Sequence, residues 1–227
     1  RRYRQMRETV DVVRLYTVQE AVETLRSNPH KAKFDETVEL AIKLNVDPRQ
    51  ADQNVRGSFS LPNGTGKTLR VIAFCEGDLA KEALAAGAVK AGGQELVDEI
   101  AKTEWTEFDV AIAHPSMMRF VGRLGKALGP KGLMPSPKAG TVTDAVVKAV
   151  HEFQAGKIEF KTDKMGNVQI PVGKMSFDNA KLVENIDSFI HHLVSIKPTS
   201  VKGRYLTKMT LTSTMGPGLK LTSGLNV

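Results

Sequence analysis

Residues 69–87, LRVIAFCEGDLAKEALAAG, determine the fold class predicted for the middle of the chain. Residues 71–75 are apolar at every position, which is typical of a strand buried on both faces of a sheet. Asp78 is placed to cap a helix that Gly87 ends. A buried strand that leads into a helix through a short loop predicts a parallel sheet covered by helices.

The same alternation of strands and helices continues to residue 153. We expect strands at residues 69–75 and 108–113, and helices at 78–86, 94–101, 116–128 (capped by Ser116) and 143–153. Short loops separate these elements, so the region is predicted to be an open, Rossmann-like α/β domain.

Outside this region the pattern changes to strands of period two and two amphipathic helices. Residues 34–44 alternate, and Glu36 is the sole polar residue on their apolar face. Further strands are expected at 54–61, 157–162, 168–172, 205–213 and 219–222, and helices ending near Leu25 and spanning 177–196. Residues 163–167 predict a hairpin between two of these strands.

The two ends of the chain therefore predict one discontinuous α+β domain, residues 1–68 and 159–227, into which an α/β domain, residues 69–158, is inserted. Chain termini usually lie close together, which makes such an insertion feasible. The two terminal segments carry 12 basic against 9 acidic residues and 9 against 5, whereas the middle carries 11 of each. The basic excess therefore belongs to the outer domain.

Composition excludes several classes of protein. Apolar residues make up 41% of the chain, enough for a buried core, and no stretch is apolar enough to span a bilayer. Cys75 is the only cysteine, so no intramolecular disulfide forms, and we expect a buried thiol. The net charge of +7 is a mild indication of a polyanionic partner. The arginine-rich residues 1–4 fit a transit-peptide remnant or the basic arm of an RNA-binding protein, and we favour the arm.

No residue pattern supports catalysis, a cofactor or a metal site. Residues 64–68 resemble the end of a phosphate-binding P-loop, but Leu61 stands where that motif needs glycine, and a strand follows where it needs a helix. His191 and His192 are adjacent on a helix and cannot share a metal unaided. A doubly wound enzyme is one rival hypothesis, although the glycine fingerprint is absent after residues 69–75. A protein–protein interaction module is the other, and it should show no salt-dependent RNA binding.

Two segments favour a nucleic-acid partner. Residues 119–140, RFVGRLGKALGPKGLMPSPKAG, hold five basic residues and no acid, and glycine-turn amides together with lysines suit phosphate groups. Thr210, Thr212, Ser213 and Thr214 form a run of hydroxyls at a strand end, which suits ribose 2′-hydroxyls and RNA shape. Core packing is the default expectation for Phe34.

Five strings carry a resemblance to a known family: AKFDETVELAIKLNVDPRQADQNVRG, LPNGTGK, VGRLGKALGPKGLMPSPKAGTVT, AGKIEFKTDKMGNVQIPVGK and TSTMGPG. Through them the chain resembles, over residues 32–218, the bacterial and organellar form of the ribosomal protein L1 family, which builds the mobile stalk of the large ribosomal subunit beside the tRNA exit site. This resemblance implies a non-enzymatic, monomeric component of a cytoplasmic or organellar ribosome. It also implies a first domain from both termini and an inserted α/β domain joined by a hinge.

The resemblance implies functions and residues as well. The first domain would hold the stalk region of large-subunit rRNA through Lys33, Phe34, Thr37, Asp163, Lys164, Thr214, Met215 and Gly216. The stalk of the family swings to help release deacylated tRNA, and many bacterial members repress translation of their own mRNA. We expect the tRNA to face Arg123, Lys126, Lys131 and Lys138 in the basic segment, and the hinge to lie at Thr68 and Ile158.

Overall fold

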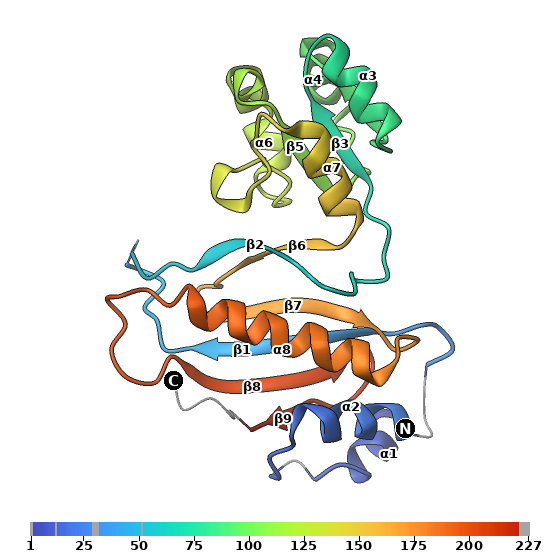
Figure 1. The fold of residues 1–227 in the computed structure, drawn as a ribbon, viewed down its shortest axis with the longest axis vertical. Helices are drawn as coiled ribbons and strands as arrows, with labels where there is room; N and C mark the ends of the chain where they lie inside the picture. The colour runs from blue at the N-terminus through green and yellow to red at the C-terminus, as the bar shows by residue number, and fades with distance from the viewer. Residues whose placement is uncertain (1, 12, 29–31, 51, 223–227) are drawn as a thin grey trace. The chain divides into compact units, whose positions relative to one another are not determined.

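The computed structural model describes residues 2–11, 13–28, 32–50 and 52–222 (Figure 1). These residues form three sheets, with strand orders β7-β1-β8-β9, β2-β6 and β4-β3-β5. The chain divides into two compact units, one made of Arg1–Gly66 and Phe160–Val227 and the other of Lys67–Glu159. The predicted mixture of α+β structure with several sheets is confirmed.

The first unit is built on a four-stranded antiparallel sheet. Its central strands are β1 (Thr37–Leu44) and β8 (Leu206–Ser213), with β7 (Asn167–Lys174) and β9 (Leu219–Leu221) at the edges. Along β1, every second side chain is fully buried, as the period-two pattern predicts. The alternate side chains remain partly or fully exposed. One face of the sheet is therefore core and the other is open.

Two helices cover the core face of this sheet. Helix α8 (Asn179–Ser195) lies across it in Figure 1 and buries the predicted stripe of Leu182, Ile186, Phe189, Ile190 and Leu193. Helix α2 (Val18–Ser27) packs beside α8 and buries Ala21, Val22 and Leu25. The amino-terminal residues include a helix, α1 (Arg2–Glu8), in which Met6 is buried at 3% exposure.

The predicted hairpin around residues 163–167 is wrong. Strand β6 (Lys157–Lys161) pairs with β2 (Arg56–Ser60), whereas β7 pairs with β1. The backbone N–H of Thr162 donates to Val55 O at 2.9 Å and extends the contact of β6 with the β2 segment. The turn therefore joins two different sheets, since turn residues specify a reversal of the chain but not which strands pair across it.

The second unit contains a parallel sheet with helices on both faces. Strand β3 (Val71–Phe74) is central and pairs with β4 (Lys90–Gly92) and β5 (Val110–Ala113). One face packs against α4 (Gln94–Thr103), and the other packs against α3 (Asp78–Ala85) and α7 (Val146–Gln154). Cys75 is fully buried, as predicted. Strand β4 was not predicted because its three residues are too few to show a period.

Two helix starts and one helix body differ from the prediction. Gly77, with a φ of 66°, is the N-cap of α3, and Asp78 instead pairs with Lys81 at 2.9 Å. The N-cap before residue 116 is His114, whose Nδ1 accepts from the Ser116 N–H at 3.3 Å.

The predicted helix 116–128 is broken into four short pieces. They are a 3₁₀ turn at Pro115–Met117, α5 (Met118–Val121), a 3₁₀ turn at Gly122–Leu124 and α6 (Gly125–Leu128). Glycines open the last two pieces, and glycine stabilises helical backbone less than other residues do. The basic segment is therefore an irregular surface and not one continuous helix.

Candidate nucleic-acid interface

The start of β1 and the end of β8 meet at one edge of the first unit, because these strands are antiparallel. In their register Val38 faces Ser213. The Thr214 N–H donates to Thr37 O at 3.1 Å, and the Thr37 N–H donates to Thr214 Oγ1 at 3.1 Å. Six of the expected rRNA-binding residues belong to these two segments, here called the turn cluster: Lys33, Phe34, Thr37, Thr214, Met215 and Gly216.

A buried carboxylate fastens the two halves of the turn cluster together. Glu36 is only 4% exposed. Its Oε2 accepts from Ser213 Oγ at 2.6 Å and from the Met215 N–H at 3.0 Å, and its Oε1 accepts from the Ala32 N–H at 2.9 Å. Buried charge is tolerated where hydrogen bonds satisfy it. Glu36 thus fixes the turn at Met215 against the segment that carries Lys33 and Phe34.

The turn cluster exposes two large apolar side chains. Phe34 is 56% exposed and Met215 is 53% exposed, so the default expectation of core packing for Phe34 is wrong. Residues 32–36 precede the first paired residue of β1, which frees Phe34 from the strand alternation. Lys174 Nζ donates to Thr37 Oγ1 at 2.9 Å and adds a cation to the turn cluster. Lys174 was not among the residues expected to bind rRNA. Exposed apolar side chains beside hydroxyls and a cation suit a folded RNA surface.

Asp163 and Lys164 lie at the opposite end of the sheet. Asn167 pairs with Lys43 and Lys174 pairs with Thr37, so the turn at residues 163–166 is roughly 20 Å from the turn cluster at ~3.3 Å per residue along the strand. The expected rRNA-binding residues therefore form two groups rather than one.

The carboxylate of Asp163 is occupied within its own turn. Its Oδ1 accepts from the N–H groups of Asn167 and Met165, both at 2.8 Å, and its Oδ2 accepts from Asn167 Nδ2 at 2.9 Å. The backbone hydrogen bond from Asn167 is the main cause that lowers the pKa of Asp163. Asp163 therefore shapes the turn, and Lys164 is its exposed basic residue.

In the second unit, three of the four residues expected to face tRNA share one cavity. Arg123, Lys126 and Lys131 line a cavity of about 390 Å³. Arg123 also lies over the ring of Phe120, with 5.9 Å between its guanidinium carbon and the ring centroid. Lys138 does not line this cavity and is exposed on the 3₁₀ turn Pro137–Ala139.

Comparison with known proteins identifies the family. Residues 25–217 match the family model described as "Ribosomal protein L1p/L10e family". The chain belongs to this family. Three relatives named "Large ribosomal subunit protein uL1" come from Protochlamydia amoebophila, Kosmotoga olearia and Fervidobacterium nodosum. Each is 52% identical over 97% of this chain and over 93%, 95% and 94% of its own length, respectively. Membership of the L1p/L10e family confirms the resemblance and, with it, a ribosomal protein that is not an enzyme.

The glycine turn before the second unit differs from a P-loop in this L1p/L10e family member. The amide of Asn185, which is fully buried on α8, accepts from the Asn63 N–H at 3.0 Å and donates to Gly64 O at 3.0 Å and Val172 O at 2.8 Å. The turn is anchored to the helix, and β3 follows it. Its glycines serve backbone geometry, since Gly64 has a φ of 65°.

The expected hinge residues lie in different surroundings. Thr68 is exposed and outside regular structure, whereas Ile158 is 6% exposed within β6. Asp109 accepts from Lys67 Nζ at 2.9 Å and from the Arg70 N–H at 3.1 Å, so it fixes the chain on both sides of Thr68. Although desolvation opposes ionisation, these hydrogen bonds lower the pKa of Asp109 to about 2.

Metal-binding clusters and membrane-spanning helices are two further features that bear on function. Among the residues that the structure describes, no group of three or more His, Cys, Asp or Glu side chains is arranged to hold a metal ion. His191 is exposed, and His192 stacks on Phe59 with ring centroids 4.7 Å apart. No described helix has the length and apolar character needed to cross a bilayer.

Proposed function

We propose that the chain is a structural protein of the large ribosomal subunit that binds large-subunit rRNA through the turn cluster. The single observation that carries this proposal is the bonding of Glu36 to Ser213 Oγ and the Met215 N–H, which holds an exposed Phe34 and Met215 beside the Thr214 hydroxyl. A preformed surface of this kind loses little entropy on binding. RNA would be recognised by shape, 2′-hydroxyls and backbone, as most double-stranded RNA is.

The proposal extends to the arrangement of the whole protein. Residues 1–68 and 159–227 form the rRNA-binding domain, and residues 69–158 form an inserted, Rossmann-like domain on a hinge at Thr68 and Ile158. The protein acts as a monomer in a cytoplasmic or organellar ribosome and builds the mobile stalk. Through the same surface it represses translation of its own mRNA by binding a mimic of the rRNA site.

The rRNA site is tested with the double variant Thr214→Val and Met215→Asp. Loss of the Thr214 hydroxyl and the insertion of a carboxylate facing phosphates should weaken binding to a stalk rRNA fragment by roughly 100-fold, equivalent to about 3 kcal/mol. The matched control is Thr103→Val with Leu84→Asp, on exposed positions of the second unit. Equal affinity of the folded double variant and the wild type would exclude the turn cluster as the rRNA site.

The tRNA-facing assignment is tested separately. Arg123, Lys126 and Lys131 share a cavity, and Lys138 lies on a nearby stretch of chain. Changing the first three to glutamine should slow release of deacylated tRNA from the exit site and leave rRNA affinity unchanged. The same change at Lys81, Lys102 and Lys148, which are exposed on the same unit, controls for lost charge. An unchanged release rate would discard this assignment.

A further inference from the structure

A line of lysines crosses the open face of the four-stranded sheet in the first unit. Lys43 on β1 lies opposite Lys208 on β8, and Lys220 on β9 lies opposite Thr210, two residues farther along β8. Lys208 and Lys220 are therefore diagonal neighbours, at about 7–8 Å between their Cα atoms. We call Lys43, Lys208 and Lys220 the lysine stripe.

A groove with basic and hydroxyl side chains runs along the stripe. A cavity of about 340 Å³ is lined by Leu15, Arg204, Thr207, Lys208, Met209, Thr210, Lys220, Leu221 and Thr222. No acidic side chain and no aromatic ring is among these lining residues. The groove therefore combines charge and hydrogen-bonding groups with the aliphatic surface of Leu15, Met209 and Leu221, and none of the lining side chains is a ring on which a base could stack. Such a surface suits phosphates more than nucleobases.

One acid outside the strands interacts with the stripe: after the hydrogen bonds from Asn167, the charge of Lys43 contributes to lowering the pKa of Asp163. On the open face of β1, the acid closest along the strand is Glu39, about 13 Å from Lys43 at ~3.3 Å per residue. Within the described part of the chain, no carboxylate forms an ion pair with Lys208 or Lys220. Like charges directly opposite each other weaken a sheet. A bound polyanion would relieve this repulsion.

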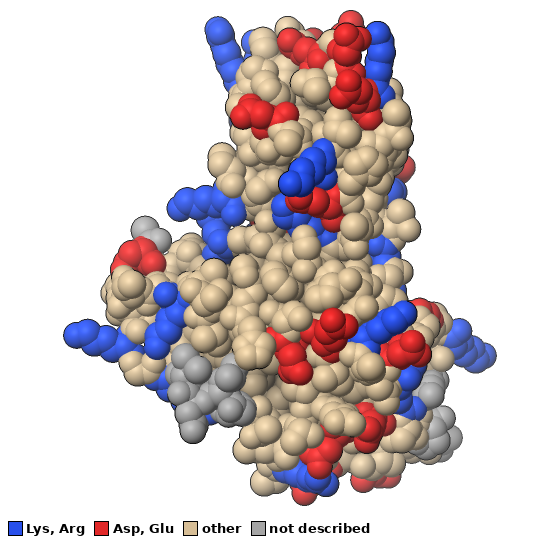
Figure 2. Space-filling model, in the orientation of Figure 1, with Lys and Arg blue, Asp and Glu red and all other residues tan. Residues whose placement is uncertain are grey.

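The helix-covered face of the same unit differs in charge. Figure 2 shows that face, on which acidic and basic side chains are interspersed. Helix α8 alone carries Glu184 and Asp187 as well as Lys181. Positive charge without acidic neighbours is thus a property of the groove beside Lys208 and Lys220 and not of the unit as a whole.

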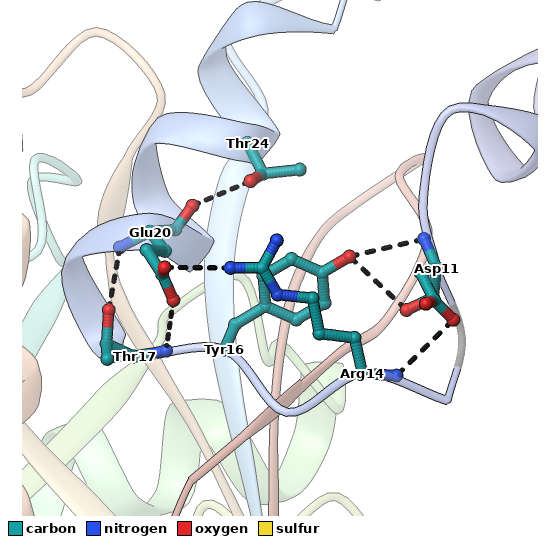
Figure 3. Close-up of polar contacts among 6 residues, drawn as sticks. All are labelled: Asp11, Arg14, Tyr16, Thr17, Glu20 and Thr24. Carbon is teal, nitrogen blue, oxygen red and sulfur yellow. Dashed lines mark hydrogen bonds and ion pairs between the residues drawn. The ribbon is translucent and has the colours of Figure 1, made fainter.

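The edge strand that carries Lys220 is held in place by the amino-terminal segment. The Tyr16 N–H donates to Lys220 O at 2.9 Å, and the Thr222 N–H donates to Tyr16 O at 2.8 Å. Figure 3 shows how Tyr16 is fixed in turn: its hydroxyl accepts from the Asp11 N–H at 3.2 Å, and Arg14 lies beside the ring, 5.0 Å from its centroid. Lys220 therefore projects from backbone that is ordered before any ligand binds.

The segment is secured at its other end by the start of α2. Thr17 Oγ1 accepts from the Glu20 N–H at 3.2 Å, and Glu20 Oε2 accepts from the Thr17 N–H at 2.9 Å, which is a capping box (Figure 3). Arg14 reaches the same carboxylate at 2.8 Å. These contacts make the groove a preformed surface, which lowers the entropic cost of binding.

We propose that the lysine stripe binds phosphates of an RNA backbone as a second contact surface, separate from the turn cluster. This inference rests on the proposed rRNA-binding function and deepens it. Lys43 Nζ also donates to Met165 O, so the stripe continues to the turn that carries Lys164. Thr37 and Lys43 are six residues apart on β1, about 20 Å at ~3.3 Å per residue, so the two surfaces contact different parts of the RNA. The turn cluster recognises shape, and the stripe adds affinity that does not depend on sequence.

The test compares the full chain with the variant K43Q/K208Q/K220Q in binding to a stalk rRNA fragment over a range of salt concentrations. Each lost phosphate contact lowers the slope of log K against log [salt] by about 0.7–0.9, so the slope should fall by about 2–3. The ratio of affinities for the stalk fragment and for an unrelated RNA should stay constant. K81Q/K102Q/K148Q, with the same loss of charge on the second unit, should leave the slope unchanged.

Four outcomes are distinguishable. If Lys43→Gln disturbs the turn at Met165, K208Q/K220Q alone should still lower the slope by about 1.4–1.8. If the wild type binds the fragment but the slope is unchanged in both variants, the proposed role of the lysine stripe is overturned. The RNA-backbone proposal is also overturned if the wild type binds inorganic phosphate saturably and both variants lose this binding but keep their RNA binding. The stripe would then be a site for free anions. Failure of the wild type to prefer the stalk fragment instead overturns the proposed function itself.

Discussion

The buried carboxylate of Glu36 is the residue on which the geometry of the turn cluster depends. It receives three donors, from Ala32, Ser213 and Met215. In Glu36→Gln, one oxygen becomes an NH₂ group that faces a donor whichever way the amide turns. We expect a loss of about 1–3 kcal/mol in the free energy of unfolding, because a buried donor is left unsatisfied. Urea unfolding followed by circular dichroism measures this loss.

Glu39→Gln is the matched control, since Glu39 lies on the same strand with its side chain on the open face. It should change the unfolding free energy by less than about 0.5 kcal/mol. Glu36→Asp should restore neither the stability nor the rRNA affinity, because its shorter side chain cannot reach both Ser213 Oγ and the Met215 N–H. A Glu36→Gln protein as stable as the wild type would contradict the role of this carboxylate.

Phe34 distinguishes a binding role from a core role. At 56% exposure, Phe34→Ala should cost less than about 0.5–1 kcal/mol of stability, whereas a buried phenylalanine would cost about 3–5 kcal/mol. Affinity for the stalk rRNA fragment should fall by roughly tenfold, because contact of an aromatic ring with RNA is worth about 1–3 kcal/mol. Tyr3→Ala, at a position 51% exposed on α1, controls for the loss of an exposed ring. A large loss of stability with intact RNA binding would refute this assignment.

At the residue scale, the sequence indicated which positions were unusual but not what they contact. Glu36 was visible as the one polar residue on an apolar face, yet its partner Ser213 lies 177 residues away in the sequence. Phe34 was in phase with the buried face, but pairing of β1 starts at Thr37 and releases it. Lys174 carried no local pattern at all. Contacts across strands depend on register, which composition does not specify.

At the scale of single elements, the ion pairs at the start of β3 give a pH-dependent prediction. Asp109 has a pKa of about 2 in the folded protein against an ordinary value of 3.8, with hydrogen bonds from Lys67 and Arg70. Because the pKa of Asp109 is lower in the folded than in the unfolded protein, its carboxylate stabilises the fold fully above about pH 4. This stabilisation is lost as the pH falls towards 2. Asp109→Asn should therefore destabilise the second unit at neutral pH and match the wild type near pH 2.

The expected size of this effect is about 1–2 kcal/mol, less than the full shift implies, because Lys67 and Arg70 are more than half exposed and solvent screens them. Trp105 is the only tryptophan and lies in the second unit, so its fluorescence reports the unfolding of that unit. Asp78→Asn, whose ion pair with Lys81 is largely exposed, is the control and should have almost no effect. An equal deficit of Asp109→Asn at pH 7 and pH 2 would contradict the prediction.

Elements with a long, regular period were predictable, and elements defined by partners were not. The stripe of α8 and the alternation of β1 follow from side-chain spacing alone, so both were placed correctly to within a few residues. The 116–128 segment had helical spacing, but Gly122 and Gly125 interrupt the helix. The hairpin failed for a different reason: β6 finds its partner in β2, more than ninety residues earlier in the chain.

At the scale of the whole molecule, the change from period-two strands to alternating strands and helices indicated an inserted segment, and the charge division pointed the same way. The structure has two compact units, with the second formed by Lys67–Glu159. Sequence alone could not specify which rRNA-binding residues share a surface, because Asp163 and Thr214 are carried to opposite ends of one sheet by its antiparallel order.

The independence of the first unit gives the last prediction. Strands β2 and β6 are paired, so the chain leaves and re-enters this unit along neighbouring strands, and α8 packs against β7 and α2 of the same unit. Replacing residues 67–156 with a short glycine–serine linker keeps β6 whole and should leave a folded protein, because a domain has its own hydrophobic core. Both the turn cluster and the lysine stripe remain in it, so its affinity and its salt slope for the stalk rRNA fragment should equal those of the full chain. A folded first unit that binds this fragment no better than unrelated RNA would mean that recognition requires the second unit.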